Sequence, residues 1–298
     1  MILYLLYRMG VFFALILPVK FSYFMACLFA DGFYCISAKD RKAVTDNLSI
    51  IMNGSKDEKT LRGMARQVFR NFAKYLVDFF RFQIIDEDYV KKFVRISGEN
   101  NMKAALAMGK GAIALSAHIG NWELGGSALS LAGYPVSAVV LTHQNRMIND
   151  FFTHQRLKGK VRPIEIGATL KSCYKILRSN NILALLGDRD FTKSGLVLDF
   201  FGRPAQIPRG PAAFSYRIGS AIVPTFMIRQ PDDTFTLFME EPILPDPSET
   251  EDAAIVNLTK KYLSVIESYI KAYPTQWHVF RNIWSNNDKE SLRPDTII

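Results

Sequence analysis

His118 and Glu123 are the two residues whose types and spacing are best suited to chemistry. They follow the apolar run at residues 112–115, which predicts a buried strand, and Asn121 predicts the N-cap of the next helix. Histidine titrates nearest neutral pH, so His118 is suited to remove a proton from a hydroxyl, while Glu123 is suited to orient the ring. The same residue types also occur together in structural roles, so the pair by itself is a hypothesis of general-base catalysis.

A second polar group follows the apolar run at residues 182–186. Asp188, Arg189 and Asp190 form a D-x-D pattern, which in many glycosyltransferases holds a divalent cation for a sugar nucleotide. Pairing of Arg189 with its acidic neighbours explains the same pattern without a metal. The four histidines have no metal-ligand spacing, and we expect no metal site.

Two arginines downstream are suited to bind a phosphate group. Arg203 and Arg209 precede a helix that is expected to begin after Pro211, and a helix N-terminus favours anions. Surface charge without a ligand is the alternative for both. The chain lacks the G-x-S-x-G, Walker, G-x-G-x-x-G and H-E-x-x-H motifs, so none of those enzyme classes is supported.

The composition indicates an anionic partner and a lipid environment. The 298 residues carry a formal net charge of +9, and 49% are hydrophobic with 22 phenylalanines. Residues 1–37 are almost all apolar, but the uncharged runs Met9–Val19 and Phe21–Ala30 are too short to span a bilayer. We expect two apolar helices, broken near Pro18, that lie in one leaflet. A signal peptide and a buried helical hairpin are the alternatives.

A long helix is predicted at about residues 56–82, with a capping box formed by Ser55 and Glu58. Basic residues recur along it at a spacing of four: Arg62, Arg66, Arg70 and Lys74. Such a stripe is typical of a face that meets an anionic membrane, although an ordinary solvated helix face has the same pattern.

From residue 93 onward, short apolar runs alternate with helical patterns, which predicts an α/β fold with a mainly parallel sheet covered by helices. The expected strands are 93–97, 111–117, 135–141, 162–166, 182–187, 221–229 and 234–240. The expected helices are 99–109, 121–133, 145–158, 168–179, 209–218 and 249–272, with a short one at 38–53 upstream. We therefore expect an N-terminal membrane-associated helical region at 1–90 and a catalytic domain at 91–298.

Three blocks in order resemble the lysophospholipid acyltransferase superfamily, specifically its bacterial branch of lipid A biosynthesis (late) acyltransferases and phosphatidylinositol mannoside acyltransferases. The first block is His118-x-x-x-x-Glu123. The second runs from Gly187-Asp188-Arg189-Asp190 through Phe200-Phe201-Gly202-Arg203-Pro204 to Gly210. The third is Gln276-Trp277-His278-Val279-Phe280-Arg281. The Asp188–Gly195 segment is closer to the mannoside branch.

The resemblance implies transfer of an acyl chain from acyl-carrier protein or acyl-CoA, as co-substrate, to a hydroxyl of a membrane glycolipid. The acceptor is expected to be a lipid A precursor, with a phosphatidylinositol mannoside as the alternative. His118 is the expected general base and Glu123 its orienting residue, and backbone N–H groups at Gly120–Trp122 are candidates for the oxyanion donors. Substrate contacts are expected from the following residues: Asn121, Arg189, Asp190, Arg203 and Arg209.

The same resemblance implies no cofactor, a location at the inner (cytoplasmic) membrane with the catalytic domain in the cytoplasm, and anionic lipids as partners. Nucleic acid is not an expected partner, because bulk charge is unaccompanied by any binding motif. Two other functions stay open on the residues alone. One is a metal-dependent glycosyltransferase that uses Asp188 and Asp190, and the other is a membrane-surface interaction protein without activity.

Overall fold

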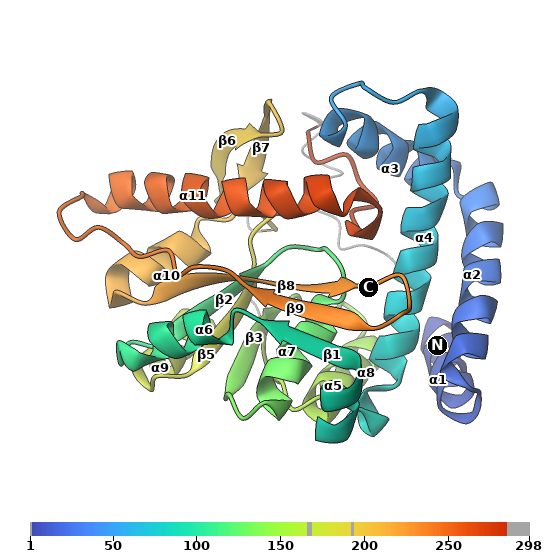
Figure 1. Cartoon of the computed structure of the whole chain (residues 1–298), viewed down its shortest axis with the longest axis horizontal. Coiled ribbons are helices and arrows are strands. Elements are labelled where there is room, and N and C mark those ends of the chain that lie inside the picture. Colours follow the sequence, from blue (N-terminus) through green and yellow to red (C-terminus); the bar gives the residue numbers. More distant parts are fainter. Residues whose placement is uncertain (1, 166–168, 192–193, 285–298) are drawn as a thin grey trace.

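A seven-stranded sheet forms the centre of the computed structural model, which describes residues 2–165, 169–191 and 194–284 (Figure 1). The strand order is β1-β9-β8-β2-β5-β3-β4, and the five strands from β8 to β4 are mutually parallel. β9 runs antiparallel to β8, and β1 pairs with β9 in parallel. The strand bounds are β1 Val94–Ser97, β2 Ala112–Ser116, β3 Val136–Val140, β4 Arg162–Glu165, β5 Ile182–Leu186, β8 Ala221–Arg229 and β9 Phe235–Met239.

Helices cover both faces of the sheet, because its central strands are apolar on both sides. Alternate residues of β2 pack into two separate cores: Ala112 and Ala114 face one, while Ile113 and Leu115 face the other. The first core includes residues of α5 (Glu87–Phe93), α6 (Glu99–Ala107), α7 (Trp122–Leu131) and α8 (Arg146–Lys158). The second includes residues of α9 (Thr169–Arg178), α10 (Gly210–Ile218) and α11 (Glu251–Ala272). The predicted α/β fold is thereby confirmed.

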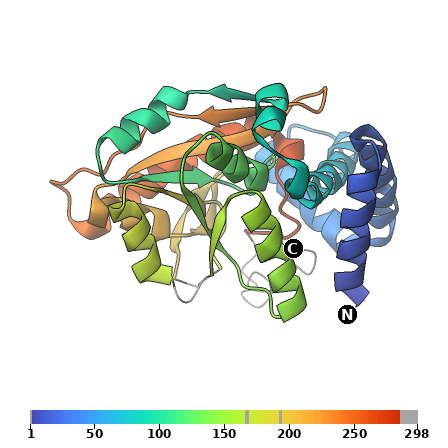
Figure 2. The ribbon, with the colours of Figure 1, turned by 90° about the horizontal axis from the view of Figure 1, so that it is seen from below.

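Four N-terminal helices stand together at one side of the sheet, opposite α9 and α10, in both views (Figures 1 and 2). They are α1 (Ile2–Ile16), α2 (Val19–Ile36), α3 (Ala38–Ile51) and α4 (Glu58–Phe80). The predicted break at Pro18 is confirmed, since Pro18 is the N-cap of α2. The predicted capping box is wrong in detail: Asp57, not Ser55, caps α4 by accepting the backbone N–H of Thr60 at 2.8 Å.

The basic stripe on α4 is not an open membrane-facing surface. Arg66 and Arg70 both bind the Asp31 carboxylate of α2, at 2.7 and 2.6 Å. Lys74 pairs with Asp233 in the β8–β9 turn, and Arg62 pairs with Glu58 one helical turn earlier. These cations are therefore neutralised within the chain, and three of them fasten α4 to its neighbours. The spacing of four was read correctly, but the partners come from segments that are distant in sequence.

Exposed apolar side chains gather on α1 and α2 instead. Examples are Phe12 and Phe24, both 58% exposed, and Phe29, 73% exposed. Among the described residues, α2 alone is long and apolar enough to cross a membrane, and 17% of it is buried. Burial in lipid removes such surface from water, so this face is suited to a membrane.

The predicted strands and helices from residue 93 to 272 are all present, with ends that differ by one or two residues. Residue 166 of the predicted strand 162–166 and residue 168 of the predicted helix 168–179 lie outside the described residues. So do residues 192–193 of the loop that follows the predicted strand 182–187. The sequence did not reveal α5 or the hairpin of β6 (Leu196–Phe200) and β7 (Arg203–Ile207). Its two-residue turn, Phe201-Gly202, has positive φ at both positions, which is common for glycine and rare for phenylalanine.

Candidate active site

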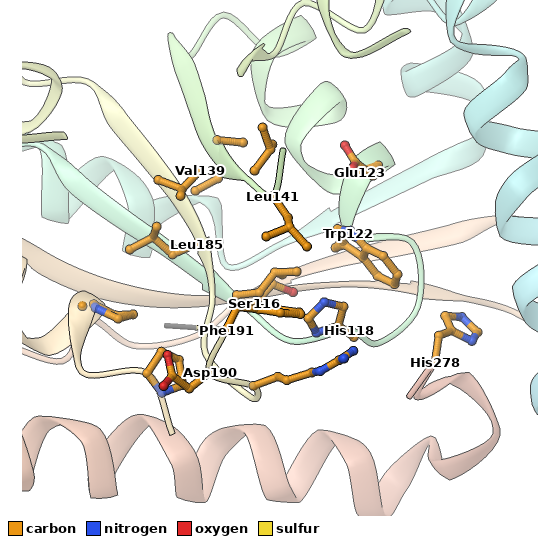
Figure 3. A pocket seen from close by; sticks show the side chains of 18 of the residues that line it. Ser116, His118, Trp122, Glu123, Val139, Leu141, Leu185, Asp190, Phe191 and His278 are labelled. Carbon is orange, nitrogen blue, oxygen red and sulfur yellow. The ribbon is translucent and has the colours of Figure 1, made fainter. Parts of the chain in front are cut away.

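His118 lies in the loop between β2 and α7, at the carboxyl edge of the parallel strands. The loop makes its turn at Gly120, whose φ is +63°. A Cβ on that residue would lie 1.9 Å from the backbone oxygen of Met227, so only glycine fits. The side chain of His118 is 15% exposed and lines a large cavity (Figure 3). The strand, the glycine turn and the helix start thus present the imidazole to the cavity.

Asp188 holds the His118 ring, and its position follows from the sheet. β5 pairs with β2 in the register Ser116↔Leu186, so His118 and Asp188 each lie two residues beyond paired positions. Asp188 Oδ1 is 2.9 Å from His118 Nδ1, and Oδ2 accepts the His118 backbone N–H at 3.0 Å. In the tautomer that donates its Nδ1 proton to Asp188, Nε2 is the ring nitrogen that can accept a proton.

The Asp188 carboxylate is fully buried but stays ionised. Burial by itself raises the pKa of Asp188, but the His118 ring and hydrogen bonds from His118 and Trp277 outweigh it, so the pKa lies below its usual value. The Trp277 indole Nε1–H donates to Oδ2 at 2.9 Å. The negative charge therefore persists beside the ring, where it would stabilise an imidazolium.

Glu123 does not orient His118, which corrects the sequence-based expectation. Its carboxylate accepts three hydrogen bonds from the Arg156 guanidinium of α8, between 2.7 and 3.1 Å. Both side chains are 9% exposed. Burial lowers the pKa of Arg156, but the Glu123 carboxylate outweighs that effect and the pKa lies above its usual value. Both residues line the cavity, so the motif glutamate contributes a buried ion pair to its wall.

The loop that carries His118 is held on the side of α4 by a buried polar network. Asn121 caps α7 by accepting the Leu124 backbone N–H at 3.0 Å, and its Nδ2 donates to Asp78 of α4 at 2.8 Å. Tyr23 of α2 and Arg229 of β8 also donate to the Asp78 carboxylate. Asn121 does not line the cavity, so the expected substrate contact is replaced by this anchoring role.

Two backbone N–H groups of the same loop also donate hydrogen bonds to other segments. The Gly120 N–H donates to the Gln276 carbonyl at 2.9 Å, and the Asn121 N–H donates to the Met227 carbonyl at 2.8 Å. These two amides are therefore excluded as the oxyanion donors that the sequence suggested.

The C-terminal block Trp277–His278 completes the site from the other side. The His278 N–H donates to the His118 carbonyl at 2.7 Å, and Ile119 forms an isolated bridge with Trp277. Burial lowers the pKa of His278 to about 3, so its ring is neutral at pH 7. His278 lines the cavity, and its Nδ1 is buried without a hydrogen-bond partner among the described residues.

The cavity has a volume of about 1220 Å³, and its lining, which includes His118, comes from three regions. One region lies between the sheet and α7, one lies between α9 and α10, and one lies beside α3 and the C-terminal block. Figure 3 shows Ser116, His118 and Trp122 in the lining, with Val139 and Leu185 further along. A cavity of this size is larger than the usual site of one drug-sized ligand.

The first region is a narrow apolar space that we call the alanine slot, defined by Ala114, Ala184 and Ala138 with Gly125 and Gly126. The three alanines are direct neighbours across β2, β5 and β3. On the α7 side, Cβ atoms added to Gly125 and Gly126 would come within 3.3 Å of Met227 and Val161. The three alanines and the two glycines all line this part of the cavity.

The other predicted substrate-binding residues divide into two groups. Arg189, Asp190 and Arg209 line the cavity. Asp190 Oδ2 accepts the Gly195 N–H at 2.9 Å, and the Arg189 guanidinium lies 4.5 Å from the centre of the Phe191 ring. Arg203 is on the exposed β6–β7 hairpin and does not line the cavity, so its expected phosphate contact is not supported.

The D-x-D pattern does not form a cation site in the described part of the chain, where no three His, Cys, Asp or Glu side chains are placed to hold a metal ion. The oxygens of Asp188 are bound to His118 and Trp277 instead. The metal-dependent glycosyltransferase alternative therefore loses its motif. Sequence reasoning found Asp188 but assigned it the wrong partner. The available signal was its place at the end of a strand, like that of His118.

The chain is similar to known proteins over most of its length. Residues 1–286 match the family model described as bacterial lipid A biosynthesis acyltransferase. The chain is 28% identical over 232 residues to a phosphatidylinositol mannoside acyltransferase of Mycobacterium tuberculosis, covering 75% of this chain and 71% of that protein. It is 24% identical to the Mycolicibacterium smegmatis protein of the same name, covering 74% and 72%. It is 23% identical to a lipid A biosynthesis palmitoleoyltransferase of Escherichia coli, covering 72% and 69%.

Proposed function

Because the chain belongs to the bacterial lipid A biosynthesis acyltransferase family, we propose that it moves a fatty acyl chain from a thioester to a hydroxyl of a membrane glycolipid. The donor is acyl-carrier protein or acyl-CoA, and no metal or other cofactor takes part. The observation that carries the proposal is the His118–Asp188 pair at the mouth of the alanine slot. A base beside an apolar slot places a hydroxyl and an acyl carbonyl together.

His118 Nε2 takes the proton of the acceptor hydroxyl as its oxygen attacks the thioester carbonyl. A carbon–oxygen bond forms, and the resulting tetrahedral oxyanion then collapses with cleavage of the carbon–sulfur bond. The leaving thiolate receives the proton from the His118 imidazolium, so the enzyme returns to its starting state. Asp188 keeps the ring in the required tautomer and offsets its transient positive charge.

The acyl chain lies in the alanine slot. This space is apolar, is reached from His118, and is walled by side chains of one methyl group or none. Removing each methylene of a fatty chain from water contributes about 0.8 kcal/mol. Binding of the chain in the slot thus provides affinity and places the thioester carbonyl next to the base.

The glycolipid acceptor reaches the site from the side of α3, where His278 and the region's charged rim meet the cavity. Exposed apolar side chains of α1 and α2 enter one leaflet and hold this side against the inner membrane, with the catalytic domain in the cytoplasm. Arg189, Asp190 and Arg209 contact the substrates. The greater identity to mannoside acyltransferases favours a phosphatidylinositol mannoside acceptor, and a lipid A precursor is the alternative.

The test is mass spectrometry of membrane lipids from cells that lack the protein and are supplied with either wild type or His118→Ala. We expect a glycolipid one acyl chain lighter to accumulate without the protein and with His118→Ala, and to disappear with wild type. The sugar composition of that lipid identifies the acceptor. Full activity of His118→Ala would overturn the mechanism, and an unchanged lipid profile in all strains would overturn the function.

A further inference from the structure

A groove on the surface continues the second region of the cavity outward between α9 and α10. The cavity wall there includes Cys173, Tyr174 and Phe214. Tyr174 and Arg217 line both the cavity and the groove, so the two spaces adjoin. The remaining residues that line the groove are Lys171, Lys175, Arg178 and Ser179.

The groove is strongly cationic. Lys171, Lys175 and Arg178 recur along one face of α9, and Arg217 faces them from α10. Glu251 pairs with Arg217 at 2.6 Å. The charge of Arg217 is offset by this pair, whereas Lys171, Lys175 and Arg178 form one wall of the groove, whose lining contains no carboxylate. Such an arrangement attracts phosphate groups over a distance of about one Debye length.

The third region of the cavity, beside α3, has a different charge pattern. Lys42 pairs with Asp46 at 2.6 Å, and Asp40 lines the same wall. Lys39 and Arg281 line this region as well, so cations and carboxylates are mixed there, whereas the lining of the groove holds cations without a carboxylate. The two regions therefore differ in their charge pattern.

The groove and the region beside α3 also differ in where they lie. The α9–α10 groove is on the opposite side of the molecule from α1 and α2, which carry the exposed apolar side chains (Figures 1 and 2). A lipid acceptor has to approach from the membrane side. A water-soluble donor is free to approach from the side that faces away from it.

We propose that the α9–α10 groove binds the phosphate groups at the far end of the donor's pantetheine chain. The donor then enters between α9 and α10 with its acyl chain in the alanine slot, and the acceptor enters beside α3. Both donor types share this chemistry, since coenzyme A carries a diphosphate at that end and carrier protein a phosphodiester. The inference rests on the proposed function, because it assumes a thioester donor.

The test measures binding of unreactive thioether analogues to the full chain in detergent. S-hexadecyl-CoA carries the phosphates, S-hexadecyl-pantetheine lacks them, and a carrier protein bearing the same thioether represents the second source. The variant is Lys171→Ala/Lys175→Ala. The control is Lys260→Ala/Lys261→Ala, which removes two exposed charges from α11 outside the cavity lining.

In the groove variant we expect the Kd of S-hexadecyl-CoA to rise about tenfold, as loss of two exposed ion pairs allows. The Kd of S-hexadecyl-pantetheine should stay unchanged, and the control should bind both like wild type. An unchanged Kd for S-hexadecyl-CoA would overturn the proposal, as would equal losses for both small analogues.

Weaker binding of the carrier protein alone would also overturn it, since the groove would then recognise an acidic protein surface. Failure of wild type to bind any analogue would instead refute the proposed acyl transfer. The two failures are therefore distinguishable.

Discussion

Asp188 holds His118 at two points: one carboxylate oxygen contacts the ring at Nδ1, and the other accepts the backbone N–H of the same residue. The distances are 2.9 and 3.0 Å. A carboxylate fixed to both ring and backbone determines the ring's orientation more closely than one bond would. Trp277 in turn fixes the carboxylate. This geometry gives Asp188 the positioning role that sequence spacing had suggested for Glu123.

Replacing Asp188 by asparagine should lower kcat by about 10³- to 10⁴-fold, because the amide favours the wrong ring tautomer. Asparagine has the same shape, so the melting temperature should change little. Steady-state kinetics and thermal unfolding measure both quantities, with Asp199→Asn, an exposed change outside the cavity lining, as the control. A kcat within tenfold of wild type would show that Asp188 does not position the base.

Glu123→Gln should destabilise the fold by about 3–5 kcal/mol, since it leaves the buried Arg156 cation without its carboxylate. The double variant Glu123→Gln/Arg156→Met should recover most of that loss, because no buried charge remains. Denaturant unfolding in detergent provides the comparison. If Glu123→Gln left stability intact while removing activity, Glu123 would have a direct role in the chemistry.

Ala184→Leu should shift the donor preference toward shorter acyl chains. Ala184 lies on β5 between Ala114 and Ala138, and a leucine there would narrow the alanine slot. Each methylene that can no longer be buried costs about 0.8 kcal/mol, or roughly fourfold in kcat/KM. Competition between donors of different length measures the shift. Short donors serve as the internal control, and an unchanged preference would place the acyl chain elsewhere.

The pH dependence of stability should depend on His278. Its pKa is lowered from 6.5 to about 3 by burial, so the unfolded chain binds a proton between these values and the native chain does not. The free energy of unfolding is therefore unaffected by His278 above pH 6.5 and decreases as the pH falls from 6.5 toward 3. Between pH 6.5 and 5 the loss is about 2 kcal/mol. Denaturant unfolding of His278→Phe should show a flatter profile, and an equally steep profile would contradict this assignment.

Phe24→Glu/Phe29→Glu should weaken binding to lipid vesicles at least tenfold. Burial of each exposed phenylalanine side chain in lipid contributes about 1.5–3 kcal/mol of binding free energy, which the variant loses. Vesicle flotation measures binding, and thermal unfolding in detergent should remain near wild type. Lys56→Glu, an exposed change in the α3–α4 loop, is the control. Undiminished flotation would mean that α2 is not the membrane contact.

Local pattern by itself determined most of the elements and the base. The apolar runs predicted β2 and β5, Asn121 predicted the start of α7, and His118 was identified by its place after β2. The β6–β7 hairpin was not predicted, because its turn needs a positive φ at Phe201, which is rare for phenylalanine. Strand and helix periodicity depends on neighbours in the chain, which is why these predictions succeeded.

Only the tertiary structure decided which side chains meet. Asp188 is 70 residues from His118, and it reaches the ring because β5 lies next to β2 in one register. Glu123 binds Arg156 of α8, which lies 33 residues away in the sequence. Arg66 and Arg70 of α4 likewise bind Asp31 of α2. Such contacts depend on strand order and helix packing, which are set by burial across the whole fold and not by spacing along the chain.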